Sequence, residues 1–315
     1  MLKVLKNKNS YLYKSMNTIG EAEKWEFSKF SKITILLTCL VFPICLSIMF
    51  FIFKEFKLID TLIINKLNIY IVKTLIPIIG LSIILKKDWK MVFESKIYIY
   101  YLWIIIFPLF NTYFYESIVS FVPQNAKTVF YYIYSILFSF CIGAIFIFVI
   151  IYRNQCLYQM HQKNVKNKFL ITISIIILGS IIFAIINWLF SLIQQQITTS
   201  ISDNQQSVGV KVDNVYSIIK SILISIIIAP IIEELVFRYL WFNFYDNKWH
   251  AILFTTIIFA FAHIQNTADW KHIISYLPLG IVNGTIFYLF KNVYPIIGIH
   301  MICNIFAFIY PFIFN

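Results

Sequence analysis

Long apolar runs dominate the chain, and short stretches rich in lysine or amide side chains separate them. A helix needs about 20 apolar residues to cross the hydrocarbon core of a membrane. Nine runs approach that length, at about 33–53, 67–85, 97–115, 129–152, 169–194, 215–244, 249–265, 273–290 and 294–314. Lys73 interrupts the second of these runs and weakens it. The pattern predicts an all-α protein, a polytopic transmembrane helix bundle with about nine spans.

Lysines gather in alternate connecting segments, which sets the expected orientation in the membrane. Residues 1–32, 86–96 and 153–168 are rich in lysine, whereas 116–127 and 195–214 contain few. We therefore expect a cytoplasmic N-terminal segment at 1–32 and N-terminal transmembrane helices at 33–194. An extracytoplasmic loop at 195–214 and a C-terminal helical region at 215–314 should follow.

The composition supports a multi-pass protein of the cell membrane. Of 315 residues, 60% are hydrophobic and 19% aromatic, and the mean hydropathy is +0.79, values that exclude an ordinary soluble domain. The net charge of +12 comes from lysines dispersed between apolar runs, so we expect no nucleic-acid partner. The lipid bilayer is the expected environment, and we make no prediction of the oligomeric state.

Residue usage adds two smaller points. Lysine greatly outnumbers arginine, and the chain is heavy in Ile, Asn and Phe, which is typical of an AT-rich bacterial genome. The five cysteines form no CxxC pair, and the N-terminal residues lack the apolar core of a cleavable signal peptide. Neither a disulfide framework nor a cysteine zinc site is therefore expected.

Ionisable side chains inside spans are rare and usually functional. The first five runs contain few, chiefly Lys73, but the last four contain a concentrated set: Glu233, Glu234, Arg238, His263, His300 and the amide Asn304. Glu234 and Arg238 are four residues apart in the order that favours an ion pair on one helical face. Glu233 is turned by about 100° from Glu234 and remains free for chemistry.

Helix geometry brings most of this set together. Glu233 and His263 lie at similar distances on either side of the polar break at 245–250, so a helical hairpin places them at similar depth. His300 and Asn304 share one face of the last span. Straight-helix counting leaves this second pair about 10 Å shallower. We expect helix tilt, or a break near Pro230, Pro278 or Pro295, to close the gap.

Three sequence motifs carry a resemblance to a known family. These are "EELVFR" (Glu233, Glu234, Arg238), "FAFAH" (Phe259, His263) and "HMICN" (His300, Asn304), and "LGIVNGTIFYLFKNVYPIIGI" precedes the last. Over about residues 215–310 the chain resembles the CPBP family of intramembrane proteases, which includes CAAX prenyl proteases and Abi-like bacteriocin-immunity proteins. One departure is Tyr239, where the family often has glycine after the arginine.

The resemblance implies an intramembrane peptidase with its catalytic core in the last four helices. Glu233 and His263 would hold and deprotonate a water molecule, and His300 and Asn304 would donate hydrogen bonds to the oxyanion. Glu234 and Arg238 would form a supporting ion pair, and Phe259 would orient His263. Bacteria of this type generally lack CAAX-prenylated proteins, so the family favours a membrane-associated peptide, a bacteriocin or a membrane protein as substrate.

Three alternatives remain open at this stage. Glu233, His263 and His300 form a donor set that could hold catalytic zinc, although the chain has no HExxH motif, and we favour a mechanism without a cofactor. A non-catalytic immunity protein of the same fold would act by binding a partner. A transporter with a Glu/His proton relay is disfavoured because the N-terminal half contains no matching polar set.

Overall fold

The described part of the chain is almost entirely helical. The computed structural model describes residues 26–109, 115–152, 168–200, 215–245, 247–264 and 267–314, and these residues contain no strand. The prediction of an all-α helix bundle is confirmed. The N-terminal segment 1–25 and most of the predicted loops at 153–168 and 195–214 lie outside the described residues.

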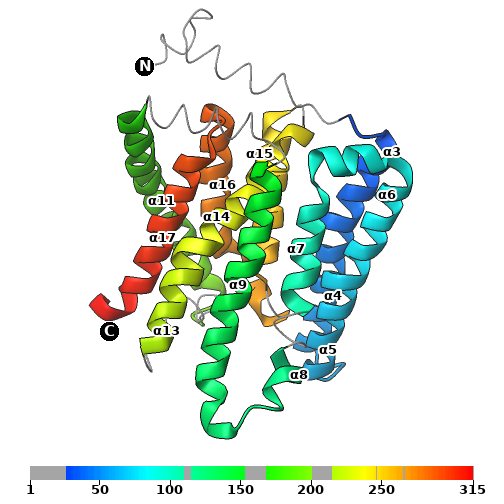
Figure 1. Cartoon of the computed structure of the whole chain (residues 1–315), viewed down its shortest axis with the longest axis vertical. Helices are drawn as coiled ribbons and strands as arrows, with labels where there is room; N and C mark the ends of the chain where they lie inside the picture. Colours follow the sequence, from blue (N-terminus) through cyan, green and yellow to red (C-terminus); the bar gives the residue numbers. More distant parts are fainter. Residues whose placement is uncertain are drawn as a thin grey trace, which may run out of the picture.

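The helices stand side by side in one bundle (Figure 1). The N-terminal half contains α3 (Lys29–Leu36), η1 (Leu37–Val41), α4 (Phe42–Glu55), α5 (Thr61–Leu67), η2 (Asn68–Leu75), α6 (Ile76–Ser95), α7 (Tyr98–Leu109), α8 (Tyr115–Val119), η4 (Gln124–Ala126), α9 (Lys127–Tyr152) and α11 (Phe169–Ile197). The C-terminal region contains α13 (Val215–Lys220), η5 (Ser221–Ile228), α14 (Ala229–Glu234), η6 (Leu235–Tyr239), η7 (Phe242–Phe244), α15 (Lys248–Ala262), η8 (Thr267–His272), α16 (Ile273–Phe290) and α17 (Val293–Phe314).

Seven helical segments among the described residues are long and apolar enough to cross a membrane. They are Lys29–Glu55, Thr61–Ser95, Gln124–Phe148, Phe169–Ile197, Val215–Tyr239, Asp269–Phe290 and Val293–Tyr310. The other two predicted spans correspond to shorter helices, α7 with 12 residues and α15 with 15. The chain is therefore a multi-pass membrane protein, although the predicted number of nine spans is not confirmed.

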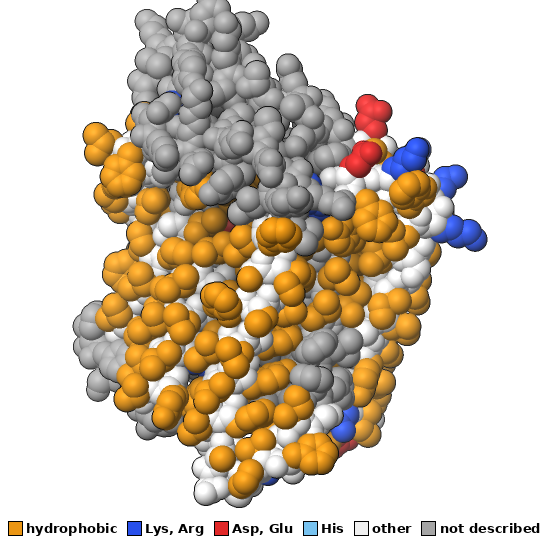
Figure 2. Space-filling view, viewed as in Figure 1, with side chains coloured by type: hydrophobic (Ala, Val, Ile, Leu, Met, Phe, Trp, Pro, Cys, Tyr) orange, Lys and Arg blue, Asp and Glu red, His pale blue; other side chains and the backbone are white. Residues whose placement is uncertain are grey.

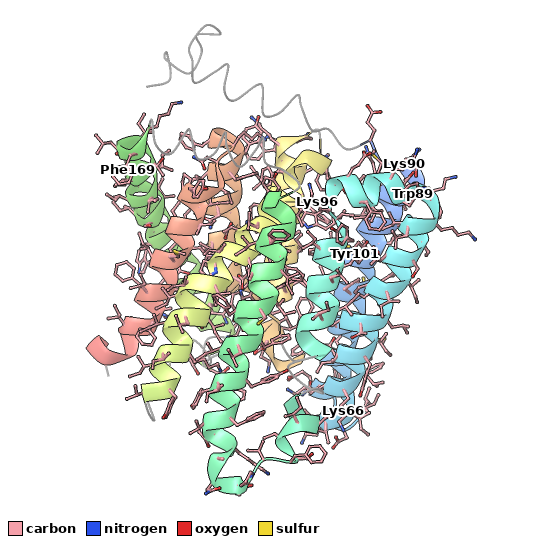
Figure 3. The ribbon with its side chains drawn as sticks, viewed as in Figure 1. Lys66, Trp89, Lys90, Lys96, Tyr101 and Phe169 are labelled. Atoms are coloured by element: carbon pink, nitrogen blue, oxygen red, sulfur yellow. The ribbon has the colours of Figure 1, made fainter. Side chains whose placement is uncertain are left out.

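The outer surface of the bundle suits a lipid environment. Figure 2 shows one flank covered by apolar side chains, with most charged groups near the upper and lower ends. Figure 3 places Trp89 and Lys90 at one end of the bundle and Lys66 at the other. Large apolar side chains such as Leu170 and Trp188 are 77% and 61% exposed along α11. A surface of this kind is unfavourable in water and is expected where helices contact lipid.

Local sequence explains how the C-terminal helices begin and where they approach closely. The Asn247 side chain accepts a hydrogen bond from the backbone N–H of Trp249 and so caps the start of α15. Pro230 lies in the first turn of α14, where its missing N–H costs little. A Cβ atom at Gly280 of α16 would lie 3.0 Å from Cα of Thr256 in α15. The glycine therefore permits the close contact between these two helices.

The helix that contains the two glutamates is not a regular α-helix. The short α14 lies between two π-helical segments, η5 and η6, and Glu233 and Glu234 are its last two residues. The wider turn of a π-helix changes the direction of the residues that follow it. Depth and direction counted along a straight helix are therefore inaccurate on both sides of the glutamate pair.

Candidate active site

Glu234 lies at the centre of the polar residues in the C-terminal region. Its side chain is completely buried, and one oxygen, Oε1, accepts from three other residues. The Arg238 guanidinium donates across 3.1 Å, Nδ2 of Asn283 across 3.0 Å and Nδ1 of His300 across 2.8 Å. This one carboxylate thus joins η6, α16 and α17.

The expected ion pair between Glu234 and Arg238 is present, and both side chains have zero exposure. Arg238 also lies over the ring of Phe259, with 4.2 Å between Cζ and the ring centroid. An aromatic face stabilises a planar cation without hydrating it. The arginine is therefore held from two sides, by a carboxylate and by an aromatic ring.

Glu233 faces the two histidines. Its Oε2 atom lies 3.6 Å from Nε2 of His263 and 3.8 Å from Nε2 of His300, both slightly too long for direct hydrogen bonds. The oxygen is buried and has no hydrogen-bond partner among the described residues. A buried carboxylate oxygen without a partner can accept a hydrogen bond from a small polar molecule such as water.

His263 is positioned by the end of its own helix and by aromatic rings. It follows directly after α15, and its Nδ1 donates to the backbone carbonyl of Phe259 across 2.8 Å. The ring stacks on Tyr276 of α16, with 4.8 Å between centroids, and lies 4.4 Å from the Phe259 ring. Phe259 therefore contacts both His263 and Arg238, and the sequence analysis had expected only the first of these contacts.

These contacts assign the protons of both histidines. Nδ1 of His263 faces a carbonyl oxygen, and Nδ1 of His300 faces a carboxylate oxygen that also accepts from Arg238 and Asn283. Both partners can only accept, so we assign the proton to Nδ1 in each ring. In a neutral imidazole the lone pair is then on Nε2. Two nitrogen acceptors and one carboxylate oxygen thus converge on one region.

Asn304 lies one helical turn beyond His300 but has a different contact. Its Nδ2 donates across 2.7 Å to the backbone carbonyl of Ser225, in η5. The structure therefore brings Glu233, Glu234, Arg238, Phe259, His263 and His300 together by direct contacts, whereas Asn304 joins α17 to η5. The offset of about 10 Å counted along straight helices is absent for His300, whose Nε2 lies 3.8 Å from Glu233 Oε2.

The sequence analysis missed Asn283. This amide is completely buried and donates both to Glu234 and to the backbone carbonyl of Ile296. It therefore links α16 to α17 next to Glu234. A detectable signal was present, because an amide inside an apolar span needs a partner. Tyr276, which stacks on His263, had no comparable signal, since aromatic residues are common throughout the chain.

The donor set for a metal ion is partly present. His263 and His300 each have Nδ1 bound to a backbone or carboxylate oxygen and Nε2 directed toward Glu233, an arrangement typical of histidines that bind zinc. The described residues nevertheless contain no group of three His, Cys, Asp or Glu side chains arranged closely enough to hold a metal ion. Glu233, His263 and His300 have suitable chemistry, and their present spacing is wider than a metal site.

Comparison with known proteins finds similarity in the same C-terminal region that contains the candidate site. A family model described as "Type II CAAX prenyl endopeptidase Rce1-like" matches residues 216–306. The "UPF0177 protein YbdI" of Lactococcus lactis is 31% identical over 91 residues, which are 29% of this chain and 49% of that protein. The "Putative membrane peptidase YdiL" of Bacillus subtilis is 29% identical over 138 residues, 41% of this chain and 55% of that protein.

The similarity is partial in length. The chain spans about half the length of the curated relatives it matches, and no solved structure matches it. The matched range nevertheless contains every polar residue of the candidate site, from Glu233 to Asn304. The resemblance inferred from the three motifs is thus confirmed over the C-terminal region, where residues 216–306 match the Rce1-like family model.

Proposed function

We propose that this protein is an intramembrane endopeptidase that hydrolyses a peptide bond of a membrane-associated peptide or membrane protein. The observation that carries the proposal is the Glu233 carboxylate. Its buried, unpartnered oxygen faces the Nε2 atoms of two histidines whose Nδ1 atoms are already engaged. Glu234 also has one buried oxygen without a partner, so what distinguishes Glu233 is that its free oxygen faces both histidine Nε2 atoms.

Glu233 acts as general base in this proposal. Distances of 3.6 and 3.8 Å from Oε2 to the two Nε2 atoms leave room for a bridging water that donates to Glu233 and to His263. Attack of the water oxygen on the substrate carbonyl carbon transfers a proton to Glu233. The same proton then passes to the departing amine, so the carboxylate is regenerated.

His300 and Asn304 stabilise the oxyanion in this proposal. When His300 is protonated on both nitrogens, Nε2–H becomes a donor that can reach the reacting carbonyl. In that form Nδ1–H would remain hydrogen-bonded to Glu234, at the observed 2.8 Å. Asn304 would supply a second donor after exchanging its present contact with the Ser225 carbonyl. Donors placed for the developing charge lower the barrier without strengthening ground-state binding.

A zinc-dependent form of the same enzyme is the main alternative. Glu233, His263 and His300 would hold the ion, which would polarise the substrate carbonyl and acidify bound water. We favour the metal-free form because it explains the unpartnered Glu233 oxygen, which would accept a proton from water as the general base. The residues at the site would otherwise bind and orient the substrate in the same way, and metal content distinguishes the two forms.

The proposal is tested in cells by replacing one oxygen of the base. Membrane and secreted peptides are compared between cells with wild-type protein and cells with Glu233→Gln, which keeps the side-chain shape. Glu94→Gln, the same change at an exposed site in α6, is the matched control. Cleavage products that require Glu233 but not Glu94 would identify the substrate. Identical peptide profiles in all three strains would contradict proteolysis and favour a non-catalytic immunity or partner protein.

A further inference from the structure

The N-terminal half of the chain reaches the catalytic region through Lys73. Lys73 belongs to η2, and its ammonium donates across 2.6 Å to the backbone carbonyl of Ile264, 191 positions later in the chain. Ile264 follows His263 directly and is 1% exposed. A lysine outside the family-matched range of 216–306 therefore touches the residue next to a proposed catalytic histidine.

This contact follows directly on the hydrogen bonds at the end of α15. The carbonyl of Phe259 accepts from the His263 ring, that of Ala260 from the His263 amide, and that of Phe261 from the Ile264 amide. Two residues beyond the end of α15, the carbonyl of Ile264 accepts from Lys73. A cation near the C-terminal end of a helix also interacts favourably with the helix dipole.

Apolar contacts and a second charge support the same junction. Phe261 of α15 is buried in a cluster with Phe50, Ile64 and Val72 of the N-terminal half, and Trp270 of η8 packs against it. The carboxylate of Asp269, which is 2% exposed, lies close enough to Lys73 to interact with its charge. Phe50, Ile64, Val72 and Lys73 are called the α15 clamp below.

The clamp and a separate ion pair hold the chain on either side of the segment after His263. Lys73 and Val72 fix the end of α15, and the Lys271 ammonium in η8 pairs with Glu55 at the end of α4 across 3.2 Å. A lysine inside an apolar span is costly and is usually retained for a task. Its partner, Ile264, directly follows the proposed catalytic residue His263, and this contact points to that task.

We propose that Lys73 is a positioning residue, through which the N-terminal helices hold His263 at its working distance from Glu233. This inference rests on the proposed function, because it assigns His263 a place in the reaction. Misplacing a reacting group by about 1 Å can reduce the rate by about 100-fold. The 3.6 Å separation of His263 Nε2 and Glu233 Oε2 is the quantity that the clamp maintains.

The first test measures the clamp without any substrate. Lys73→Met removes the donor and the charge but keeps the volume, and Lys73→Arg restores both. Lys66→Met, at an exposed position of the preceding helix α5, is the control for loss of one positive charge (Figure 3). In purified protein in nanodiscs, hydrogen exchange of peptides from 255–275 should accelerate in Lys73→Met alone. Unchanged exchange in Lys73→Met would overturn the clamp, whatever the protein's activity.

The second test measures turnover of a fluorogenic peptide that contains the cleavage site dependent on Glu233. Lys73→Met should lower kcat about 10- to 100-fold with little change in KM, and Lys73→Arg should recover most of the loss. In combination with His263→Ala, Lys73→Met should add little, since both act through one group. Normal turnover in Lys73→Met, or fully additive effects, would overturn the positioning role. If the Glu233→Gln variant still cleaves the peptide, the proposed function is wrong. The hydrogen-exchange measurement would still show whether Lys73 holds the end of α15.

Discussion

His300 donates from Nδ1 to the Oε1 atom of Glu234 across 2.8 Å, so the second glutamate orients a histidine as well as neutralising an arginine. The opposite nitrogen of the same ring, Nε2, lies 3.8 Å from Glu233. The two adjacent glutamates therefore meet His300 at different ring atoms. Substitutions can separate their tasks, because only Glu233 has a buried oxygen directed at both histidines.

Glu233→Gln should abolish cleavage while abundance and membrane insertion stay near normal. The amide keeps the shape of the side chain but cannot accept a proton from water. The measurement is turnover of the Glu233-dependent peptide by purified protein, alongside thermal unfolding. Substantial cleavage by Glu233→Gln would show that another group is the base.

Glu234→Gln should reduce stability more than it reduces turnover per folded molecule. Arg238 would lose its buried counter-charge, a change that typically costs about 3–5 kcal/mol. Thermal unfolding and the yield of folded protein are the measurements, with Glu233→Gln as the neighbouring control. A Glu234→Gln protein that is stable, abundant and inactive would reverse the roles of the two glutamates.

Asn283→Ala should lower the free energy of unfolding by about 1–3 kcal/mol, because a buried carbonyl and a buried carboxylate lose a donor. The affected partners are the Ile296 carbonyl and Glu234. Thermal unfolding should show the loss, and Gln195→Ala, an exposed amide in α11, is the control. Equal stability of the two variants would mean that Asn283 is not a structural link between α16 and α17.

Asn304→Ala should be slow but measurable. Removal of one oxyanion donor typically lowers the rate by about 100- to 1000-fold, and substrate binding should change little because the charge develops only during reaction. The measurement is kcat and KM of the purified variant. Full activity would confine Asn304 to its observed contact with the Ser225 carbonyl.

His300→Ala separates the metal-free mechanism from the zinc mechanism. If His300 is an oxyanion donor, its removal should lower the rate by about as much as the removal of Asn304. Neither the wild type nor the variant should then contain stoichiometric zinc. Metal analysis of both purified proteins, together with activity after treatment with a chelator, is the measurement. Zinc that is present in wild type and lost from His300→Ala would establish metal-dependent hydrolysis.

The sequence predicted the helical architecture and most of the residues that meet at the site, for physical reasons. Apolar runs of membrane length permit only helices here, and charged groups in such runs must pair. The four-residue spacing of Glu234 and Arg238 therefore correctly predicted an ion pair. The hairpin argument also brought Glu233 and His263 together correctly.

Finer geometry was beyond the sequence because it depends on irregular helices. The π-helical segments on both sides of α14 alter the direction of side chains, and counting along straight helices cannot represent this. The contact of Asn304 with Ser225 and the three donors at Glu234 Oε1 follow from the resulting arrangement. Lys73 was visible as an anomaly in its span, but its partner is 191 residues away.

Under the proposed function, the short length of α15 would set the depth at which a substrate is cut. Its 15 residues cover about 22 Å, less than the roughly 30 Å of a hydrocarbon core. Lys248 and the 65% exposed Trp249 at its start are typical of a membrane boundary. With the start of α15 at one boundary, His263 would lie about 22 Å away and nearer the opposite boundary, so the helix length would fix the depth of the proposed cut. A spanning substrate would be divided unequally, into one fragment that keeps most of its membrane anchor and one that can leave the bilayer.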